Sequence, residues 1–163
     1  HVNAHWIRLT DDERLAKLTL DIHLARGHSL SEHDEARLTQ AMPFIKDRAR
    51  TTLELADQTA FVLKARPLVI DERGRTQLSG EAGERIGRLR ARLALFASWD
   101  VFALETELKV FAEEESVGFG KIGPPARAAL TGGHSAPDIA KILAALGREE
   151  SLGRLDDALQ PTI

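Results

Sequence analysis

Apolar residues recur every three or four positions along most of this chain, which is the spacing of one buried face of an α-helix. The first stripe consists of Leu15, Leu18 and Ile22, and Gly27 follows it at a position suited to end a helix. Later stripes have the same spacing: Leu53, Ala56, Ala60 and Leu63; Ile86, Leu89, Leu93 and Phe96; Val101, Leu104, Leu108 and Phe111. No alternating pattern is long enough to indicate a β-strand. The sequence therefore predicts an all-α, multihelical fold.

Local signals predict where these helices begin. Thr10-Asp11-Asp12-Glu13 has the form of a capping box, in which a threonine oxygen and a glutamate carboxylate accept hydrogen bonds from amides at a helix start. Thr51-Thr52-Leu53-Glu54 has the same form, and it marks either a new start or a continuation of a helix that begins near Pro43. Ser31 is expected to open a short helix that stops near Pro43. Further starts are expected at Ser98, Pro137 and Arg148.

The helical period fails between Arg66 and Gly80, which makes this stretch the candidate linker. Pro67 cannot continue a helix, and Glu72-Arg73-Gly74-Arg75 has the composition of a turn. We therefore expect two small helical subdomains, residues 1–72 and 73–163, with a protease-sensitive hinge between them.

Composition narrows the class of protein only slightly. The 163 residues include no cysteine, which excludes disulfides and thiolate metal sites and fits a cytoplasmic location. No apolar run approaches the roughly 18 residues that a membrane span needs. The net charge of −3 gives no reason to expect a nucleic-acid partner, although the stretch from Ser116 to Pro137 contains no acidic residue.

One motif carries a specific resemblance. The segment 121–132 reads Lys-Ile-Gly-Pro-Pro-Ala-Arg-Ala-Ala-Leu-Thr-Gly. It resembles the Lys-Ile-x-Gln-Pro-Leu-Arg-x-Ala-Leu-Thr-Gly stretch of bacterial glutamyl-tRNA synthetases. Pro137-Asp138-Ile139 and the segment 143–149 are similar to the family's Pro-x-Leu and Leu-x-x-Leu-Gly-Lys/Arg-Glu. The segments 2–8 and 46–53 give weaker matches, so the resemblance extends from the first residues to about Leu159.

This resemblance implies a fold and a partner. The fold would be of the class I synthetase anticodon-binding type, and the chain would be the C-terminal part that recognises the pyrimidine-uracil-cytosine anticodon of tRNA(Glu). The full-length enzyme would attach glutamate to that tRNA with ATP and Mg²⁺. The family's two ATP motifs, His-x-Gly-His and Lys-x-Ser-Lys-Ser, do not occur in this sequence. We therefore expect this part to be an inactive monomer without a cofactor.

The resemblance also selects candidate tRNA-binding residues. Arg48 and Arg50 match the helix that approaches the third anticodon base in the family. The C-terminal motif contributes Lys121, Arg127, Thr131, Gly132, His134, Ser135 and Ile139. Three positions depart from the pattern: Pro124 replaces a glutamine and loses its hydrogen bond, Ala126 replaces a leucine, and Ala136 replaces a threonine.

Each candidate also has a purely structural interpretation. Arg127 matches the O2 acceptor of a pyrimidine, but an arginine at a helix end can equally bond nearby carbonyls. Thr131, Gly132 and Ser135 precede a helix start that favours phosphate, and they could instead form a capped turn. Ile139 is either a wall under a base or an ordinary core residue. Arg48 and Arg50 could belong to a solvated helix face.

Other conspicuous residues favour structural roles. The stripe Arg85, Arg88 and Arg92 is expected to be solvated or salt-bridged. His23, His28 and His33 share no helix face, so we expect no metal site. Trp6 and Trp99 are expected to pack, although an indole can stack on a base. The main alternative function is a helical protein-interaction scaffold without RNA binding, and a histidine metalloenzyme is the third.

Overall fold

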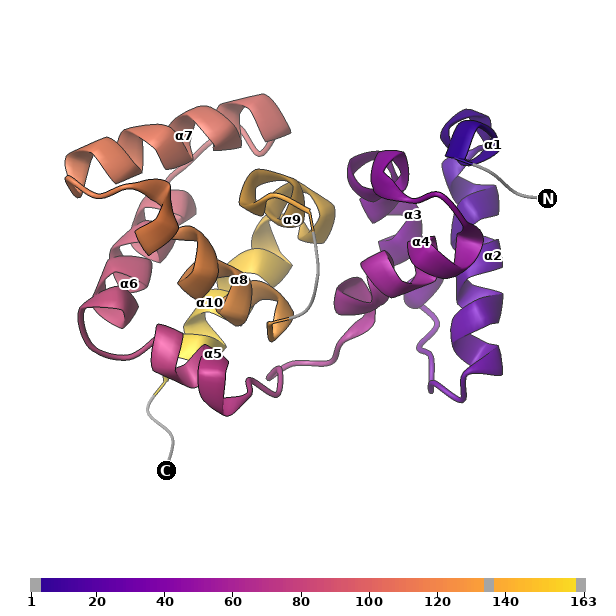
Figure 1. Cartoon of the computed structure of the whole chain (residues 1–163), viewed down its shortest axis with the longest axis horizontal. Helices are drawn as coiled ribbons and strands as arrows, with labels where there is room; N and C mark the ends of the chain where they lie inside the picture. Colours follow the sequence, from indigo (N-terminus) through magenta and orange to yellow (C-terminus); the bar gives the residue numbers. More distant parts are fainter. Residues whose placement is uncertain (1–3, 134–136, 161–163) are drawn as a thin grey trace. The chain divides into compact units, whose positions relative to one another are not determined.

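The computed structural model describes residues 4–133 and 137–160 (Figure 1). Regular structure in these two ranges is helical, with no strand, so the prediction of an all-α fold is confirmed. The described residues group into two compact units. Residues 4–64 and Pro137 belong to the first unit, and residues 65–133 and 138–160 belong to the second.

The first unit is a small helical bundle around α2. Its elements are α1 (Ala4–Leu9), α2 (Asp12–Ala25), α3 (Asp34–Ile45), the 3₁₀ turn η1 (Lys46–Arg48), α4 (Thr52–Thr59) and the 3₁₀ turn η2 (Ala60–Leu63). Helix α2 packs against both α3 and α4. Leu15, Leu38, Met42 and Leu55 from these helices are completely buried and form the core. The stripe predicted for the α4 segment was wrong at its first position, because Leu53 is 58% exposed and Leu55 is buried instead.

The second unit is built around α10, which packs against three other helices. Its elements are α5 (Glu72–Gln77), α6 (Gly80–Ala94), α7 (Val101–Glu114), the 3₁₀ turn η3 (Phe119–Lys121), α8 (Gly123–Thr131), α9 (Ile139–Leu146) and α10 (Arg148–Leu159). Helix α10 contacts α6, α8 and α9, while α7 packs on α9 and α5 packs on α8. The core includes Ile86, Leu89, Leu104, Ile142 and Leu155.

The two capping-box sequences fold differently. The Thr51 side chain accepts a hydrogen bond from the Glu54 amide at 3.1 Å, so this segment is a break and a new start. The Thr10 hydroxyl instead donates to the Trp6 carbonyl at 2.6 Å, and the N-cap of α2 is Asp11 without a side-chain capping bond. The prediction of a capping box at Thr10 was wrong because α1 ends directly before α2, and the Trp6 carbonyl of α1 accepts the hydrogen bond from the Thr10 hydroxyl.

Pro43 does not end the second predicted helix, because α3 continues through it to Ile45. Proline has no amide hydrogen, so it removes one backbone hydrogen bond from a helix. Here the loss falls in the last turn, where Met42 and Ile45 are completely buried. The burial of these two side chains outweighs one lost backbone bond.

The segment expected to be a turn at residues 72–75 is helix α5. The Asp71 carboxylate caps it by accepting a bond from the Gly74 amide at 2.7 Å. A Cβ at Gly74 would lie 2.6 Å from Ile70 Cγ2, so glycine permits close packing there. The turn prediction was wrong for this reason: Gly74 is a packing residue, and part of the expected linker is a packed helix. The domain boundary at residue 72 remains a prediction.

Two further helix starts each differ from expectation by two residues. Helix α7 is capped by Asp100 rather than Ser98, and the Asp100 side chain accepts a bond from the Ala103 amide at 2.9 Å. Helix α9 begins at Ile139 with Asp138 as its N-cap, so Pro137 lies before the first turn. The last helix, α10, begins at Arg148, as the sequence predicts.

Candidate nucleic-acid interface

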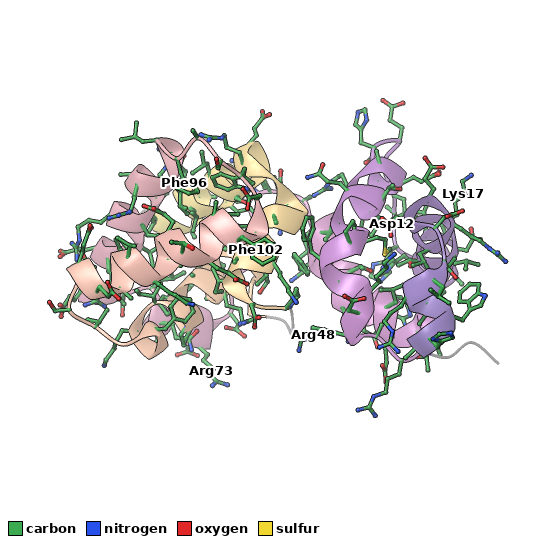
Figure 2. The ribbon with its side chains drawn as sticks, turned by 90° about the horizontal axis from the view of Figure 1, so that it is seen from above. Asp12, Lys17, Arg48, Arg73, Phe96 and Phe102 are labelled. Atoms are coloured by element: carbon green, nitrogen blue, oxygen red, sulfur yellow. The ribbon has the colours of Figure 1, made fainter. Side chains whose placement is uncertain are left out.

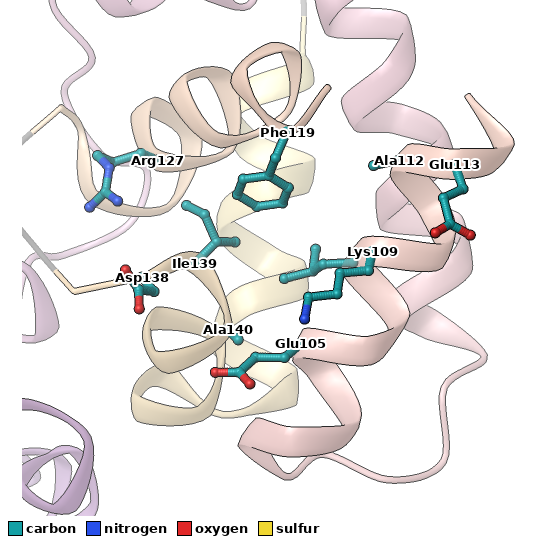
Figure 3. A pocket seen from close by; sticks show the side chains of 10 residues that line it. Glu105, Lys109, Ala112, Glu113, Phe119, Arg127, Asp138, Ile139 and Ala140 are labelled. Atoms are coloured by element: carbon teal, nitrogen blue, oxygen red, sulfur yellow. The ribbon is translucent and has the colours of Figure 1, made fainter. Parts of the chain in front are cut away.

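A cavity of about 610 Å³ opens in the second unit between α7, η3, α8 and the start of α9 (Figure 3). Its apolar surface comes from Leu108 and Ala112 of α7, Phe119 of η3, and Ile139 and Ala140 of α9. The cavity is therefore formed by segments that are far apart in the sequence, and its volume is in the range of small-molecule sites.

The same cavity carries charged side chains of both signs. Arg127 and Asp138 lie at one end of the view in Figure 3, and Glu105, Lys109 and Glu113 project from α7. Three carboxylates thus face two cations. A cavity with an apolar floor and this charge balance suits a flat, neutral group with both hydrogen-bond donors and acceptors.

Arg127 is held on a helix whose ends are both fixed. Pro124 and Pro125 occupy the first turn of α8, where proline is well tolerated. At the other end, the Thr131 hydroxyl donates to the Arg127 carbonyl at 2.8 Å and accepts a bond from the Gly133 amide at 3.2 Å. The α8 backbone therefore presents a half-buried Arg127 side chain in a defined direction.

A buried arginine fixes the end of the same helix from α10. Arg154 is 1% exposed, and its Nη1 donates to the Leu130 carbonyl at 2.7 Å. Its Nε donates to Glu150 Oε1 at 2.9 Å. Since helix-terminal carbonyls lack intrahelical partners, Arg154 satisfies one that would otherwise be buried and unbonded.

Arg127 also borders a second, smaller cavity of about 340 Å³. Asp71, Arg73 and Gly133 line this cavity with it. The Arg73 side chain projects outward from α5 (Figure 2). Arg127 therefore lies between a larger cavity with an apolar floor and a smaller, more polar one.

Of the predicted site residues, Arg127 and Ile139 line the larger cavity together. Lys121 is exposed and lines a different cavity of about 460 Å³ with Glu81 and Arg85. Thr131 is completely buried, and Gly132 ends α8 with a φ of 77°. Thr131 is covered by other residues and Gly132 has no side chain, so neither offers a side-chain contact to a ligand. Both instead fix the backbone at the end of α8.

The other predicted residues lie elsewhere. Arg48 and Arg50 are exposed in the first unit, but neither is on an α-helix: Arg48 ends η1 and Arg50 precedes α4. The helix expected there is interrupted because Thr51 caps a new one. The Arg50 amide donates to Glu54 Oε2 at 2.8 Å. His134 and Ser135, with the neighbouring Ala136, lie outside the described residues.

The arginine stripe of α6 forms ion pairs, as the sequence indicates. Arg88 bonds both oxygens of Glu115 at 2.9 and 2.6 Å, and Arg85 Nε lies 3.3 Å from the same carboxylate. Arg92 pairs with Glu107 and Glu114. The hydrogen bonds to Glu115 raise the pKa of Arg88 above its usual value, and those to Glu114 and Glu107 do the same for the pKa of Arg92.

The tryptophans pack within their units. Trp99 Nε1 donates to the Leu143 carbonyl at 2.9 Å, and the Arg148 guanidinium lies 5.1 Å from the indole centroid. Arg14 lies 5.3 Å from the centroid of Trp6. Among the residues that the structure describes, no group of three or more histidine or acidic side chains is arranged to hold a metal ion.

Sequence reasoning selected only Arg127 and Ile139 of the ten residues that line the cavity, and Asp138 and Phe119 are notable among those it missed. Asp138 was not selected because the sequence places it in the first turn of a helix that begins at Pro137, where an acidic residue is ordinary. In the structure it is the N-cap of α9. Its side chain makes no capping bond, however, and it lines the cavity. Phe119 stands between Gly118 and Gly120 and is 43% exposed. The available signal was an aromatic residue flanked by glycines directly before the segment 121–132.

The comparisons with known proteins agree with this helical architecture. A family model described as "Anticodon binding domain" matches residues 13–159, so the chain belongs to the anticodon binding domain family. None of the described helices has the length and apolar character to cross a membrane.

Curated relatives make the family membership more particular. The chain is 49% identical over 162 residues to glutamate–tRNA ligase of Phenylobacterium zucineum (strain HLK1), covering 99% of this chain and 35% of that protein. It is 51% identical over 158 residues to glutamate–tRNA ligase of Caulobacter sp. (strain K31), covering 97% and 33%. The chain thus spans about a third of the length of these relatives.

A solved structure has the same fold. The glutamate tRNA ligase from Elizabethkingia meningosepticum CCUG26117 superposes with a TM-score of 0.72 at 20% sequence identity. The superposition covers 96% of this chain and 30% of that chain.

Proposed function

We propose that this chain is the C-terminal, anticodon-binding part of a glutamate–tRNA ligase, and that it binds the anticodon arm of tRNA(Glu). The observation that carries the proposal is the family match over residues 13–159, which extends through both compact units. The larger cavity supports it, because an exposed aromatic ring and an arginine beside an apolar floor are the features with which proteins bind unstacked RNA bases.

The proposed recognition uses both units. In the second unit, Arg127 donates to a pyrimidine edge, while Thr131 and Gly132 hold the backbone that carries it. Lys121 supplies a positive charge for the phosphate backbone. In the first unit, the exposed side chains of Arg48 and Arg50 approach another anticodon nucleotide. His134, Ser135 and Ile139 complete the proposed set.

The aminoacylation reaction is proposed for the full-length protein. That protein would be a monomeric cytoplasmic class I synthetase that uses ATP and Mg²⁺ to attach glutamate to tRNA(Glu). We expect no ATP site in this chain, because the sequence lacks both ATP motifs. The chain alone should therefore show no ATP–pyrophosphate exchange. Nothing in the comparisons supports the alternative of a protein-interaction scaffold.

The test is salt-dependent binding of an RNA hairpin that carries the tRNA(Glu) anticodon arm, measured by fluorescence anisotropy. Affinity should fall steadily as salt rises, since contacts to phosphates release counterions. Arg127→Ala should lower the affinity about ten-fold, because a base contact is worth roughly 1–3 kcal/mol. The same variant should bind a hairpin with the contacted pyrimidine replaced about as well as the wild-type chain does, since that contact is already lost.

Arg88→Ala is the matched control on a neighbouring helix. Its guanidinium is already paired with Glu115, so its removal should leave RNA affinity and the salt slope unchanged. Absence of any salt-dependent binding, or equal losses in the two variants, would refute the proposed function.

A further inference from the structure

We propose that the larger cavity of the second unit takes one unstacked pyrimidine base of the anticodon, with Phe119 as its stacking surface and Asp138 as the acceptor for a base N–H group. This inference rests on the proposed function and adds two specificity-determining residues to it. The cavity is the one of about 610 Å³ in Figure 3.

The charges of the cavity select a base rather than a phosphate as the occupant. Asp138, Glu105 and Glu113 contribute three carboxylates, whereas Lys109 and Arg127 contribute two cations. A phosphate would be repelled by this surplus of negative charge, while the N–H groups of a base are attracted to it. The apolar floor supports the same choice, because a base has large flat faces that gain from leaving water.

Phe119 has the exposure that a stacking surface requires. It is 43% exposed, whereas Ile139, another apolar residue that lines the cavity, is only 2% exposed. Gly123 lies close to the ring, since a Cβ there would be 3.3 Å from Phe119 Cε1. A larger residue at position 123 would press on the ring, so the glycine helps to keep Phe119 where it lines the cavity.

Asp138 supplies an acceptor that the helix does not use. It is the N-cap of α9, a position where an aspartate usually accepts a bond from a helix amide, but its side chain makes no such bond. Its carboxylate instead lines the cavity that Arg127 also borders (Figure 3).

A pyrimidine edge matches this pair. Uracil has an N3–H donor between two carbonyl acceptors, and cytosine has an N4 amine beside N3 and O2. In either case the carboxylate of Asp138 accepts from the N–H group and the guanidinium of Arg127 donates to a neighbouring acceptor. A base whose donor has been methylated would place a methyl group against the carboxylate and lose that bond.

The experiment measures affinities of the chain for anticodon-arm hairpins in which each anticodon base in turn is blocked at its donor. The blocked bases are 3-methyluridine and N4,N4-dimethylcytidine. Blocking one particular position should weaken binding to the wild-type chain about ten-fold, which is within the range of a single base contact. Asp138→Ala should show less than a two-fold loss with that same RNA, because the contact is already gone.

Glu105→Ala is the matched control, since it also removes one carboxylate from the cavity. It should retain the full ten-fold loss on the blocked RNA, and both variants should show wild-type circular dichroism. Phe119→Leu keeps the apolar volume without the aromatic face. It should bind all hairpins about ten-fold more weakly, except a hairpin that is abasic at the same position.

The outcomes separate this inference from the proposed function. If the chain binds the hairpins and loses affinity with Arg127→Ala, but the losses from Asp138→Ala and the blocked base multiply, the base does not contact Asp138 and only this inference fails. If no hairpin binds in a salt-dependent way, the proposed function fails and this inference falls with it.

Discussion

The two units each bury an ionisable side chain, but they stabilise it in opposite ways. In the first unit, His23 is 2% exposed and its Nε2 has no hydrogen-bond partner. In the second, Arg154 is 1% exposed and bonds Glu150 and the Leu130 carbonyl. Burial therefore favours the neutral form of the histidine, whereas the arginine keeps its charge because a carboxylate and a carbonyl replace its water. The comparison predicts that mild acid lowers stability through the buried His23 of the first unit, and that the buried Arg154 of the second unit contributes no such dependence on pH.

The surroundings of His23 explain why its neutral form is favoured. Burial lowers the pKa of His23 below its ordinary value of 6.5, and the nearby His28 and Arg26 lower that pKa further. The His28 ring meets the His23 ring edge-on at 5.4 Å. Asp57 and the Ala56 carbonyl act in the opposite direction on the pKa but do not outweigh the loss of water.

The largest expected effect tests the arginine side of the comparison. Arg154→Leu should lower the free energy of unfolding by about 3 kcal/mol, because Glu150 and the Leu130 carbonyl are then left without their buried partner. Urea denaturation followed by circular dichroism measures this change. Glu150→Gln, which keeps an acceptor for Nε, should cost clearly less. Equal effects of the two substitutions would show that charge neutralisation, and not the bond to Leu130, dominates.

A smaller effect tests the histidine side. The folded state holds His23 neutral, so the unfolded state binds more protons below about pH 6.5, and stability should fall as the pH is lowered through this range. His23→Gln should make the melting temperature less dependent on pH between about pH 8 and pH 5. His28→Gln should reduce that dependence only in part, since burial is the larger cause. A wild-type melting temperature that stays constant over this range would contradict the comparison.

The smallest effect is expected at the surface. Arg88 forms a two-bond ion pair with Glu115, but it is exposed, and solvent screens such pairs. Arg88→Ala should leave the melting temperature unchanged within measurement error at physiological salt. A clear decrease in the melting temperature would mean that Arg88 is needed to hold the Glu115 carboxylate in its ion pair with the buried Arg85.

The helices themselves could be predicted from the sequence because their signals are local. The stripe Leu104, Leu108 and Phe111 is buried as its spacing indicates. Gly27 ends α2 with a φ of 85°, a conformation that glycine adopts without strain. The start of α10 after Gly147 also agrees with expectation.

What could not be predicted depends on contacts between distant segments. Thr10 and Thr51 both begin a Thr-x-x-Glu pattern, and only the preceding α1 decides that Thr10 bonds backward to Trp6. Gly74 has the composition of a turn residue, but its packing against Ile70 in a helix is visible only in three dimensions.

The candidate site divides in the same way. Arg127 and Ile139 could be found from the motif, and the structure brings them to one cavity. Asp138 and Phe119 could not be assigned from the sequence. They become candidates only because α7, α8 and α9 pack together and place both side chains at the same cavity. Arg48 and Arg50 were placed on a helix because the break at Thr51 was ambiguous in the sequence.

The bond from Arg154 to Leu130 also has a consequence for local opening. It joins the last turn of α8 to the interior of α10, so the α8 end cannot fray without removing a buried cation's partner. The Gly132 amide, which donates to the Ala128 carbonyl at 2.9 Å, should therefore exchange its hydrogen with solvent as slowly as the core amides of α10 do. The end of α8, next to Gly133 and the smaller cavity, would then be among the parts of the molecule that open least often, because a buried residue of α10 holds it closed.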